Sequence, residues 1–332
     1  MKPERITKLL LIAMCAGLSP GAEGQSASPA QPSYPTRPIR LVVPFAPGGV
    51  GDLQGRMLAE KLKERLGQPV VVDNRSGANG IIGMEIVARA PADGYTLVMS
   101  VVGTWAVHPY LYKLPYDVLK DFAPVILVAT TPGVLVVHPS VKVTTTRELI
   151  ALARQKPGEL NYASTGVGGF NHIAAELFAY MTRIKLTPVP YKGAAPALID
   201  LVGGHVHVLF GSAIAAIPHI QSGRARALAT TGAKRLAALP DLPTIAESGV
   251  PGYENSIWSA VGAPARTPQA IVVRLNREIA AILQAPDMHE RFAAGGSTIT
   301  GGTPQQFHDY LKSELAKFGK LVRETGIKPE QG

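Results

Sequence analysis

The apolar positions of this chain follow two different periods. Short runs of β-branched and apolar residues at 39–43 and 70–72 are typical of buried strands. Between them, residues 52–66 repeat apolar side chains at the spacing of an amphipathic helix, and Gly67 and Pro69 end it. Strand and helix patterns keep alternating along the chain. We therefore expect an α/β fold built on parallel sheets with helices on both faces.

The remaining predicted elements continue this alternation. Further strands are predicted at 95–99, 123–129, 133–137, 160–163, 186–191, 206–210 and 226–231. Further helices are predicted at 81–89, 145–156, 171–182, 194–202 and 214–221, and two more begin near Pro268 and Pro304. Thr145 with Glu148, and Thr303 with Gln306, have the spacing of capping boxes, in which two side chains satisfy the free N–H groups of a helix start.

One short interruption divides the chain into two predicted lobes. The strands at 123–129 and 133–137 are separated only by Thr130, Thr131 and Pro132, a candidate hinge where the chain enters a second lobe. We expect 226–231 to be the return crossing. Lobe one is thus predicted to comprise residues 37–130 plus 226–332, and lobe two residues 131–225.

The N-terminus has the pattern of a secretory signal peptide. Basic residues precede an apolar run at 9–18, and small residues follow it, with Gly24 as the expected cleavage point and Ala30 as a second candidate. The run of about ten residues is too short to span a membrane, which needs roughly twenty. We predict a signal peptide at 1–24, a flexible Ser/Pro-rich segment at 25–36 and export to the periplasm.

Cysteine content and charge narrow the chemistry. Cys15, the only cysteine, lies inside the predicted signal peptide, so the exported chain has no thiol for catalysis, disulfides or metal binding. The net charge is +9, and removal of residues 1–24 would leave +8, because three basic and two acidic residues go with them. No basic run or basic–aromatic interleaving occurs, so binding of nucleic acid is not expected. A mild positive field suits small anions better.

Two glycine-rich strand-to-helix turns are the main candidates for a binding site. They span 44–52 and 164–172, and each follows a predicted buried strand and opens a helix. A helix start presents free N–H groups to an anion, and glycine lets the ligand approach the backbone. The alternative is that both are merely tight turns. Neither carries a nucleotide-binding fingerprint, so a nucleotide site is not expected. The candidate ligand-binding residues in these turns are Pro47, Gly48, Gly49, Gly51, Asp52, Ser164, Thr165, Gly166 and Gly168.

Catalytic and metal-binding patterns are weak. His205 and His207 alternate along a predicted strand but have no third ligand in the pattern, so we predict no metal site. Ser164 and His172 would suit a hydrolase only with an acid partner and an elbow turn, which are missing. We therefore predict that the protein is not an enzyme and needs no cofactor. Tyr191 and Lys192 end a predicted strand and could line the site, although a solvated surface position suits Lys192 better.

Several sequence blocks resemble the Bug family, the substrate-binding proteins of tripartite tricarboxylate transporters. The resemblance covers nearly all of the chain after residue 37. The matching blocks are 38–49 with Asp52, Val72–Arg75, Gly77–Gly80, Pro91–Leu97, Leu114–Asp117, Asp121–Val125, Val189–Gly193, Leu239–Thr244, Gly249–Glu254, Trp258 and Gly326–Pro329.

The resemblance implies a type II periplasmic-binding-protein fold. Such a Venus flytrap has a sheet in each lobe and crossing strands as the hinge, and it closes on a carboxylate held by backbone groups and water. It also implies membrane permease subunits as transient partners, with a periplasmic sensor domain as the alternative partner, and we expect a monomer. Carried over to this chain, the Pro47–Gly49 loop binds the anion in lobe one, and Ser164–Gly166 with Gly168 is its counterpart. Thr104, Trp105, Tyr191 and Ser212 complete the predicted ligand site.

The chain departs from the family pattern at Val50–Gly51, Trp105, His108, His207 and Gly211. Polar groups expected near the cleft are replaced, and Trp105 could form an apolar wall. These departures favour a larger or aromatic carboxylate over citrate or an amino acid.

Overall fold

The computed structural model describes residues 34–191 and 193–328. The predicted signal peptide, most of the segment at 25–36 and Lys192 lie outside the described residues. Within those ranges, no helix is both long and apolar enough to span a membrane.

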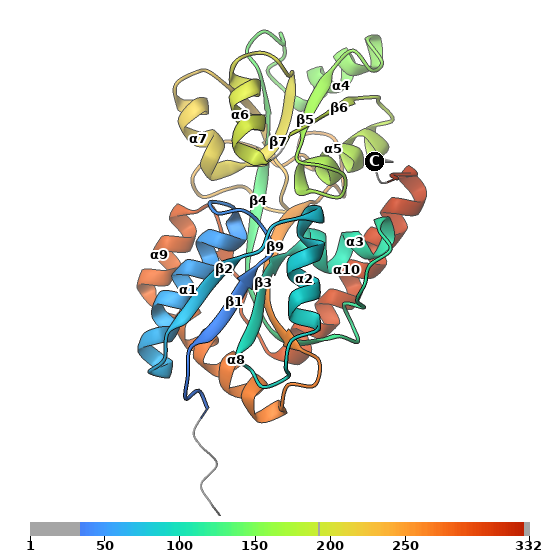
Figure 1. The fold of residues 1–332 in the computed structure, drawn as a ribbon. Coiled ribbons are helices and arrows are strands. Elements are labelled where there is room, and N and C mark those ends of the chain that lie inside the picture. The colour runs from blue at the N-terminus through green and yellow to red at the C-terminus, as the bar shows by residue number, and fades with distance from the viewer. Residues whose placement is uncertain (1–33, 192, 329–332) are drawn as a thin grey trace, which may run out of the picture. The chain divides into compact units, whose positions relative to one another are not determined.

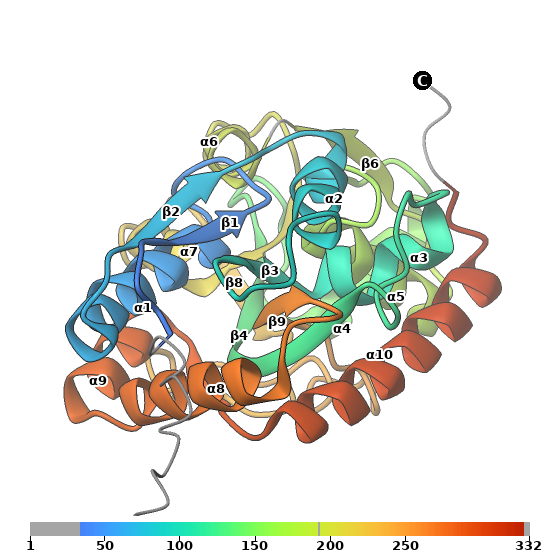
Figure 2. The same ribbon diagram turned by 60° about the horizontal axis from the view of Figure 1, so that its bottom comes forward.

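Lobe one is built on a sheet whose parallel strands lie in the order β2 (Val70–Asn74), β1 (Ile39–Val43) and β3 (Thr96–Val101). Strand β9 (Ser256–Pro264) pairs antiparallel with β3, and β4 (Phe122–Val137) pairs antiparallel with β9, so β4 runs in the direction of β1 and β3. Figure 1 shows this sheet with its helices in the lower half of the view. Figure 2 shows α8 (Gln269–Leu283), α9 (Pro286–Ala294) and α10 (Pro304–Thr325) along its underside. The elements of lobe one before β4 are β1 (Ile39–Val43), α1 (Val50–Leu66), β2 (Val70–Asn74), the 3₁₀ turn η1 (Ala78–Gly80), α2 (Ile81–Ala88), β3 (Thr96–Val101), the π-helix η2 (Gly103–Val107) and α3 (His108–Leu111). Those after lobe two are β9 (Ser256–Pro264), α8 (Gln269–Leu283), α9 (Pro286–Ala294), β10 (Thr298–Ile299) and α10 (Pro304–Thr325).

Lobe two is built on a second sheet that shares β4 (Phe122–Val137) with the first. In it β7 (Val208–Ser212) pairs antiparallel with β4 and parallel with β5 (Asn161–Ser164), which in turn pairs parallel with β6 (Thr187–Pro190). The helices of lobe two surround these strands in the upper half of Figure 1. The elements are α4 (Thr146–Gln155), β5 (Asn161–Ser164), α5 (Phe170–Thr182), β6 (Thr187–Pro190), α6 (Ala194–Val202), β7 (Val208–Ser212), α7 (Ala213–Gln221) and β8 (Arg226–Thr230).

The directions of the strands bring the functional edges of the two sheets face to face. Because β4 is parallel to β1 and β3, it leaves the first sheet at the edge where those strands have their carboxyl ends. Because β4 is antiparallel to β7, it enters the second sheet at the carboxyl end of β7. In open α/β sheets, ligands bind beyond the carboxyl ends of the strands. The turns that follow β1, β2, β3, β5, β6 and β7 therefore all start at the junction between the lobes.

Two details of the crossing differ from the sequence predictions. The predicted break at 130–132 is wrong, since β4 is one continuous strand. Pro132 still pairs with Ser256 in the first sheet, and Gly133 already pairs with Ser212 in the second, so the proline, which has no N–H to donate, lies at the change of partner. The prediction that 226–231 returns to lobe one is also wrong, because β8 pairs with β4 in the second sheet. Strand β9 makes the return.

Hydrophobic clusters fill the described parts of both lobes, and the cluster around Trp105 of lobe one also includes Val167 and Ile173 of lobe two. Helix α10 packs on lobe one and reaches α5 of lobe two, as the right side of Figure 1 shows. Thr303 and Gln306 form the predicted capping box at its start. At the start of α4, the Thr145 hydroxyl accepts from the N–H of Glu148 as predicted, but the carboxylate of Glu148 bonds to Thr144 instead of Thr145.

Candidate functional site

The first glycine turn, residues 44–49, is open on its outer side. A Cβ atom built on Gly48 or Gly49 would meet no atom within 4 Å, and both residues are exposed. Gly49 is the N-cap of α1 and supplies no side chain to its first turn. Because Gly49 offers no side-chain acceptor, the first backbone N–H groups of this 17-residue helix have no capping partner.

Asp52 anchors this turn from beneath. Its buried carboxylate, 2% exposed, accepts hydrogen bonds from the N–H of Gly48 at 2.9 Å and from the Asn74 amide at 3.0 Å. It also pairs with Arg56 at 2.9 Å. Burial raises the pKa of Asp52, but the hydrogen bonds and the Arg56 guanidinium outweigh it and hold the pKa below its usual value. The carboxylate is therefore ionised and neutralised by Arg56, so it supports the turn without repelling an anion above it.

The second glycine turn, residues 164–169, is closed in by its surroundings. Gly166 and Gly168 adopt positive φ of +101° and +81°, a conformation that favours glycine. The Ser164 hydroxyl accepts from the N–H of Gly166 at 3.2 Å, which braces the turn internally. Asn171, in the first turn of α5, accepts from Thr165 and donates to the carbonyl of Phe210. Gly169 caps α5 without a side-chain bond, as Gly49 caps α1.

The turn between β2 and α2 lies between the two glycine turns. On one side, the ring of Phe45 approaches Gly80 so closely that a Cβ there would lie 3.1 Å from it. On the other side, the side chain of Asn79 lies 3.3 Å from the position of a Cβ on Gly166. Lobes one and two are therefore in contact at this turn.

The segment after β3 makes a second contact with lobe two. A Cβ on Gly168 would lie 2.8 Å from Leu111 and 3.2 Å from the His108 ring. The hydroxyl of Tyr112 donates to the carbonyl of Val167 at 2.9 Å. His108 is 2% exposed, its Nδ1 has no hydrogen-bond partner among the described residues, and burial lowers its pKa to about 4. The ring is therefore neutral at pH 7.

Thr104 and Tyr191, two other predicted site residues, bond to neighbouring parts of their own lobes. Thr104 is buried and bonds to Ser100 and to the carbonyl of Val101. The hydroxyl of Tyr191 donates to Asp200, and its N–H donates to the carbonyl of Ser164. Ser212 ends β7 at the crossing, where it is the N-cap of α7. Gly51 is buried in α1, whereas Pro47 is exposed.

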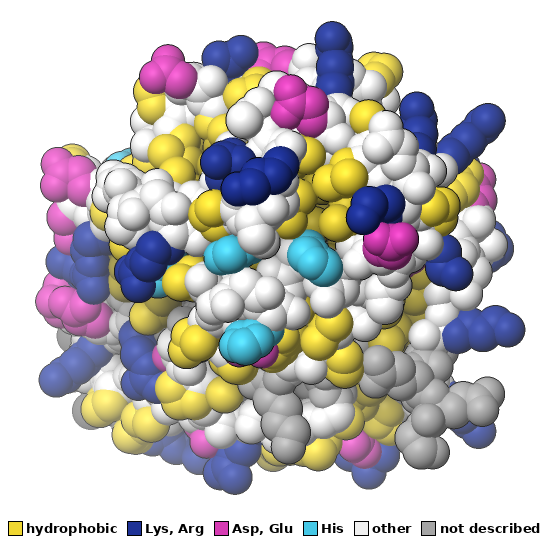
Figure 3. Space-filling model, turned by 90° about the horizontal axis from the view of Figure 1, so that it is seen from above, with side chains coloured by type: hydrophobic (Ala, Val, Ile, Leu, Met, Phe, Trp, Pro, Cys, Tyr) yellow, Lys and Arg dark blue, Asp and Glu magenta, His cyan; other side chains and the backbone are white. Residues whose placement is uncertain are grey.

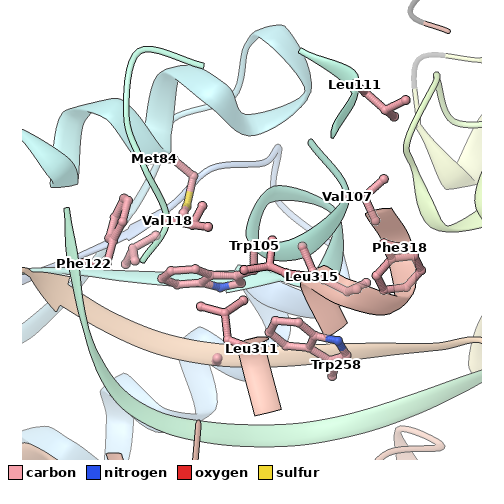
Figure 4. Packing of buried hydrophobic residues seen from close by; sticks show 14 of the residues in the cluster. Met84, Trp105, Val107, Leu111, Val118, Phe122, Trp258, Leu311, Leu315 and Phe318 are labelled. Atoms are coloured by element: carbon pink, nitrogen blue, oxygen red, sulfur yellow. The ribbon is translucent and has the colours of Figure 1, made fainter. Parts of the chain in front are cut away.

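Trp105 lies in the core of lobe one. Its ring is 1% exposed and makes edge contacts with Phe122 and Phe307 at centroid distances of 5.2 and 5.6 Å. Figure 4 shows it surrounded by apolar side chains, with Leu311 close by. Its position gives it a packing role, so we do not carry it into the proposed ligand site.

His207 also lies away from the lobe junction. It precedes β7, at the opposite end of that strand from Ser212, and its Nδ1 accepts from the N–H of Asn161 at 3.1 Å. The departures at Trp105 and His207 therefore give no support for an aromatic ligand. No group of three metal-ligating side chains occurs among the described residues.

Ser164 and His172 form no catalytic pair. The Ser164 hydroxyl is engaged within its own turn, while the His172 ring lies 6.3 Å from the ring of Tyr162. Nδ1 of His172 has no hydrogen-bond partner among the described residues, and burial lowers the pKa of this histidine to about 4.

Two surface cavities of about 550 and 670 Å³ lie in lobe two away from the glycine turns. One is bordered by Lys142, Glu148 and His207, and the other by Arg226 and Asp241. Figure 3 views this end of the molecule, where histidine and basic side chains gather on the surface. Neither cavity receives a helix N-terminus from a glycine turn, and we assign neither a role.

The sequence analysis did not place Asn79, His108, Leu111 or Tyr112 at the lobe junction. Asn79 belonged to a block noted only for its resemblance, and His108 only for its departure. One signal was available for Asn79, since residues 77–80 follow a strand parallel to β1 and so had to lie at the same edge. No local signal marked Tyr112, which reaches lobe two only through the folding of η2 and α3.

Comparison with known proteins finds chains of similar sequence and structures of similar fold. Residues 55–327 match the model of the tripartite tricarboxylate transporter family receptor. Protein BugT of Bordetella pertussis is 41% identical over 296 residues, which cover 87% of this chain and 90% of BugT. The structure of R. palustris Rpa4515 with adipate is 43% identical, with a TM-score of 0.84 over 89% of this chain and 99% of that chain. MatC from Rhodopseudomonas palustris with bound malate is 30% identical, with a TM-score of 0.80 over 87% of this chain and all of that chain (100%).

Proposed function

The chain belongs to the tripartite tricarboxylate transporter receptor family of solute-binding proteins, and we propose that it captures an aliphatic dicarboxylate between its lobes. In this proposal the protein is exported to the periplasm, binds the solute there and delivers it to the membrane permease of such a transporter.

The observation that carries the proposal is the open space above Gly48 and Gly49 at the start of α1. Free backbone N–H groups and the positive end of the helix dipole attract a carboxylate. Asp52 adds no net negative charge there, because Arg56 pairs with it. Helix α5 starts at a second uncapped glycine on the facing lobe, which suits a ligand with an anionic group at each end.

Two further observations favour an aliphatic chain between the carboxylates. Trp105, the side chain that suggested an aromatic ligand, is buried in the core. The similar proteins Rpa4515 and MatC were solved with adipate and malate, both aliphatic dicarboxylates.

Binding would operate through closure of the lobes. A ligand that contacts both turns gains its full set of interactions only in the closed form, so it shifts the population toward that form. The permease would then distinguish loaded from empty protein by shape.

The test is a thermal-shift and calorimetric screen with C4 to C8 dicarboxylates, malate and phthalate. Hexanoate is the matched control for adipate, because it keeps the chain length and lacks the second carboxylate. Adipate or a near homologue at a hundredfold excess over Kd should stabilise the protein by about 2.7 kcal/mol, and hexanoate by far less. Equal stabilisation by hexanoate, or a response to phthalate alone, would contradict an aliphatic dicarboxylate.

A further inference from the structure

The turn at residues 77–80 is held in an unusual backbone conformation. Its four successive residues have positive φ: +137° at Gly77, +45° at Ala78, +53° at Asn79 and +92° at Gly80. Asparagine tolerates this region, but alanine adopts it only at a cost in free energy. Such strain persists where the surrounding structure fixes it, and it is concentrated at functional sites. The turn holds the Asn79 side chain against lobe two.

Asn79 and Tyr112 connect lobe one to the second glycine turn. The Asn79 amide donates to the Tyr112 hydroxyl at 3.1 Å, and that hydroxyl donates to the Val167 carbonyl at 2.9 Å. Val167 lies between Gly166 and Gly168, the two residues whose Cβ positions are occupied by Asn79 and by Leu111 with His108. The hydroxyl thus bonds to one group on each lobe.

We propose that Asn79 and Tyr112 form an interlobe latch on the Val167 carbonyl, which sets how long the lobes remain closed. The proposal relies on the proposed function only for the identity of the ligand that the closed lobes hold. The hydrogen bonds of the latch are present in the structure whatever the ligand is. Rotation that opens the lobes at this edge separates Tyr112 from Val167 and exposes both groups to water. The hydrogen bond therefore contributes to the closed form alone. Tyr112 acts here as a positioning residue, since it holds the second turn in place without itself contacting the ligand.

The variant that tests the latch is Tyr112→Phe, which removes only the hydroxyl and keeps the ring beside His108. Tyr110→Phe is the matched control, because Tyr110 belongs to the adjoining helix α3 and packs on Gly319 within lobe one. Asn79→Gly is a second variant, which keeps the positive φ and removes the amide.

Two measurements test the latch, and the first of them does not depend on the proposed function. The first needs no ligand: spin labels on Gln155→Cys in lobe two and Gln269→Cys in lobe one, in a Cys15→Ser background, report the interlobe distance by pulsed EPR. Tyr112→Phe should give a broader distribution of interlobe distances, displaced from that of the wild type, whereas Tyr110→Phe should match the wild type.

The second measurement is the dissociation rate of adipate. Tyr112→Phe should raise this rate about 3- to 10-fold, the range expected for loss of one hydrogen bond. Asn79→Gly should change both readouts in the same direction.

Wild-type distances and rates in Tyr112→Phe would overturn the latch, as would an equal effect of Tyr110→Phe. If no carboxylate binds the wild type, the proposed function fails, and the interlobe distances still decide whether the latch exists.

Discussion

The two glycine turns of this protein look alike in sequence but face different surroundings. Each leaves the carboxyl end of a parallel strand and opens a helix through a glycine N-cap, Gly49 or Gly169. Around the first turn, the positions of missing side chains are open space. Around the second, those of Gly166 and Gly168 are filled by atoms of the other lobe, and that of Gly169 is filled by Thr165 and Gly166 of the same turn. Glycine therefore leaves room for a ligand beside the first turn, and at Gly166 and Gly168 it permits contact between the lobes.

The anchors of the two turns differ as well. An ionised Asp52 with its Arg56 partner holds the first, whereas the neutral amide of Asn171 holds the second. A charged anchor suits the exposed turn, because Arg56 reaches solvent, while a neutral anchor suits the turn enclosed between lobes.

Removal of the side chain that anchors either turn should lower the free energy of unfolding more than the other changes predicted below. Asp52→Ala leaves the Gly48 N–H, the Asn74 amide and Arg56 without their acceptor, and should lower the free energy of unfolding by about 2 to 4 kcal/mol. Asn171→Ala removes two neutral hydrogen bonds and should cost about 1 to 3 kcal/mol. Urea denaturation at pH 7.5 measures both. A larger loss for Asn171→Ala would contradict the assignment of the charged anchor as the stronger one.

Mild acid should affect the surroundings of the second turn before those of the first. His108 and His172 have pKa values lowered to about 4 by burial, so the unfolded chain, with its usual value of 6.5, binds more protons as the pH falls. Stability is therefore lost between about pH 6.5 and 4, and each histidine should account for about 2 kcal/mol between pH 7.5 and 5. The pKa of Asp52 is lowered, so its contribution to stability is lost only as the pH falls below 3.8, the usual pKa of an aspartate.

Single His108→Gln and His172→Gln variants check this pH dependence. Each should make the free energy of unfolding less sensitive to pH in that window, relative to the wild type. An unchanged slope in both variants would show that other groups cause the acid sensitivity.

A methyl group in the second turn should have a moderate effect. Gly168→Ala places a Cβ 2.8 Å from Leu111 at a positive φ of +81°, so stability should fall by about 1 to 2 kcal/mol. Leu111→Ala in the same chain removes the clash but not the backbone strain, so the two substitutions should be non-additive in chemical denaturation. Strict additivity would indicate that the turn does not touch Leu111.

The sequence patterns predicted the local structure well and the partners of each element less well. The alternation of strands and helices, the glycine turns and the capping box at Thr303 all appear in the structure. The sheet that β8 joins was not predictable, because a buried strand has the same pattern whichever sheet it belongs to. Trp105 shows the same limit: a large aromatic residue after a strand suits a ligand wall or a core, and only packing against Phe122 and Phe307 distinguishes them.

The most direct measurement of the central claim is the affinity of Gly49→Ala for the dicarboxylate identified in the screen. Gly49 has φ −79° and ψ 169°, which alanine adopts freely, and a Cβ there meets no protein atom within 4 Å. Calorimetry should show affinity reduced by about tenfold or more, as expected when a methyl group keeps a carboxylate off the helix start, with the unfolding free energy within about 0.5 kcal/mol of the wild type. Wild-type affinity in Gly49→Ala would show that the ligand does not lie on this turn and would contradict the proposed site.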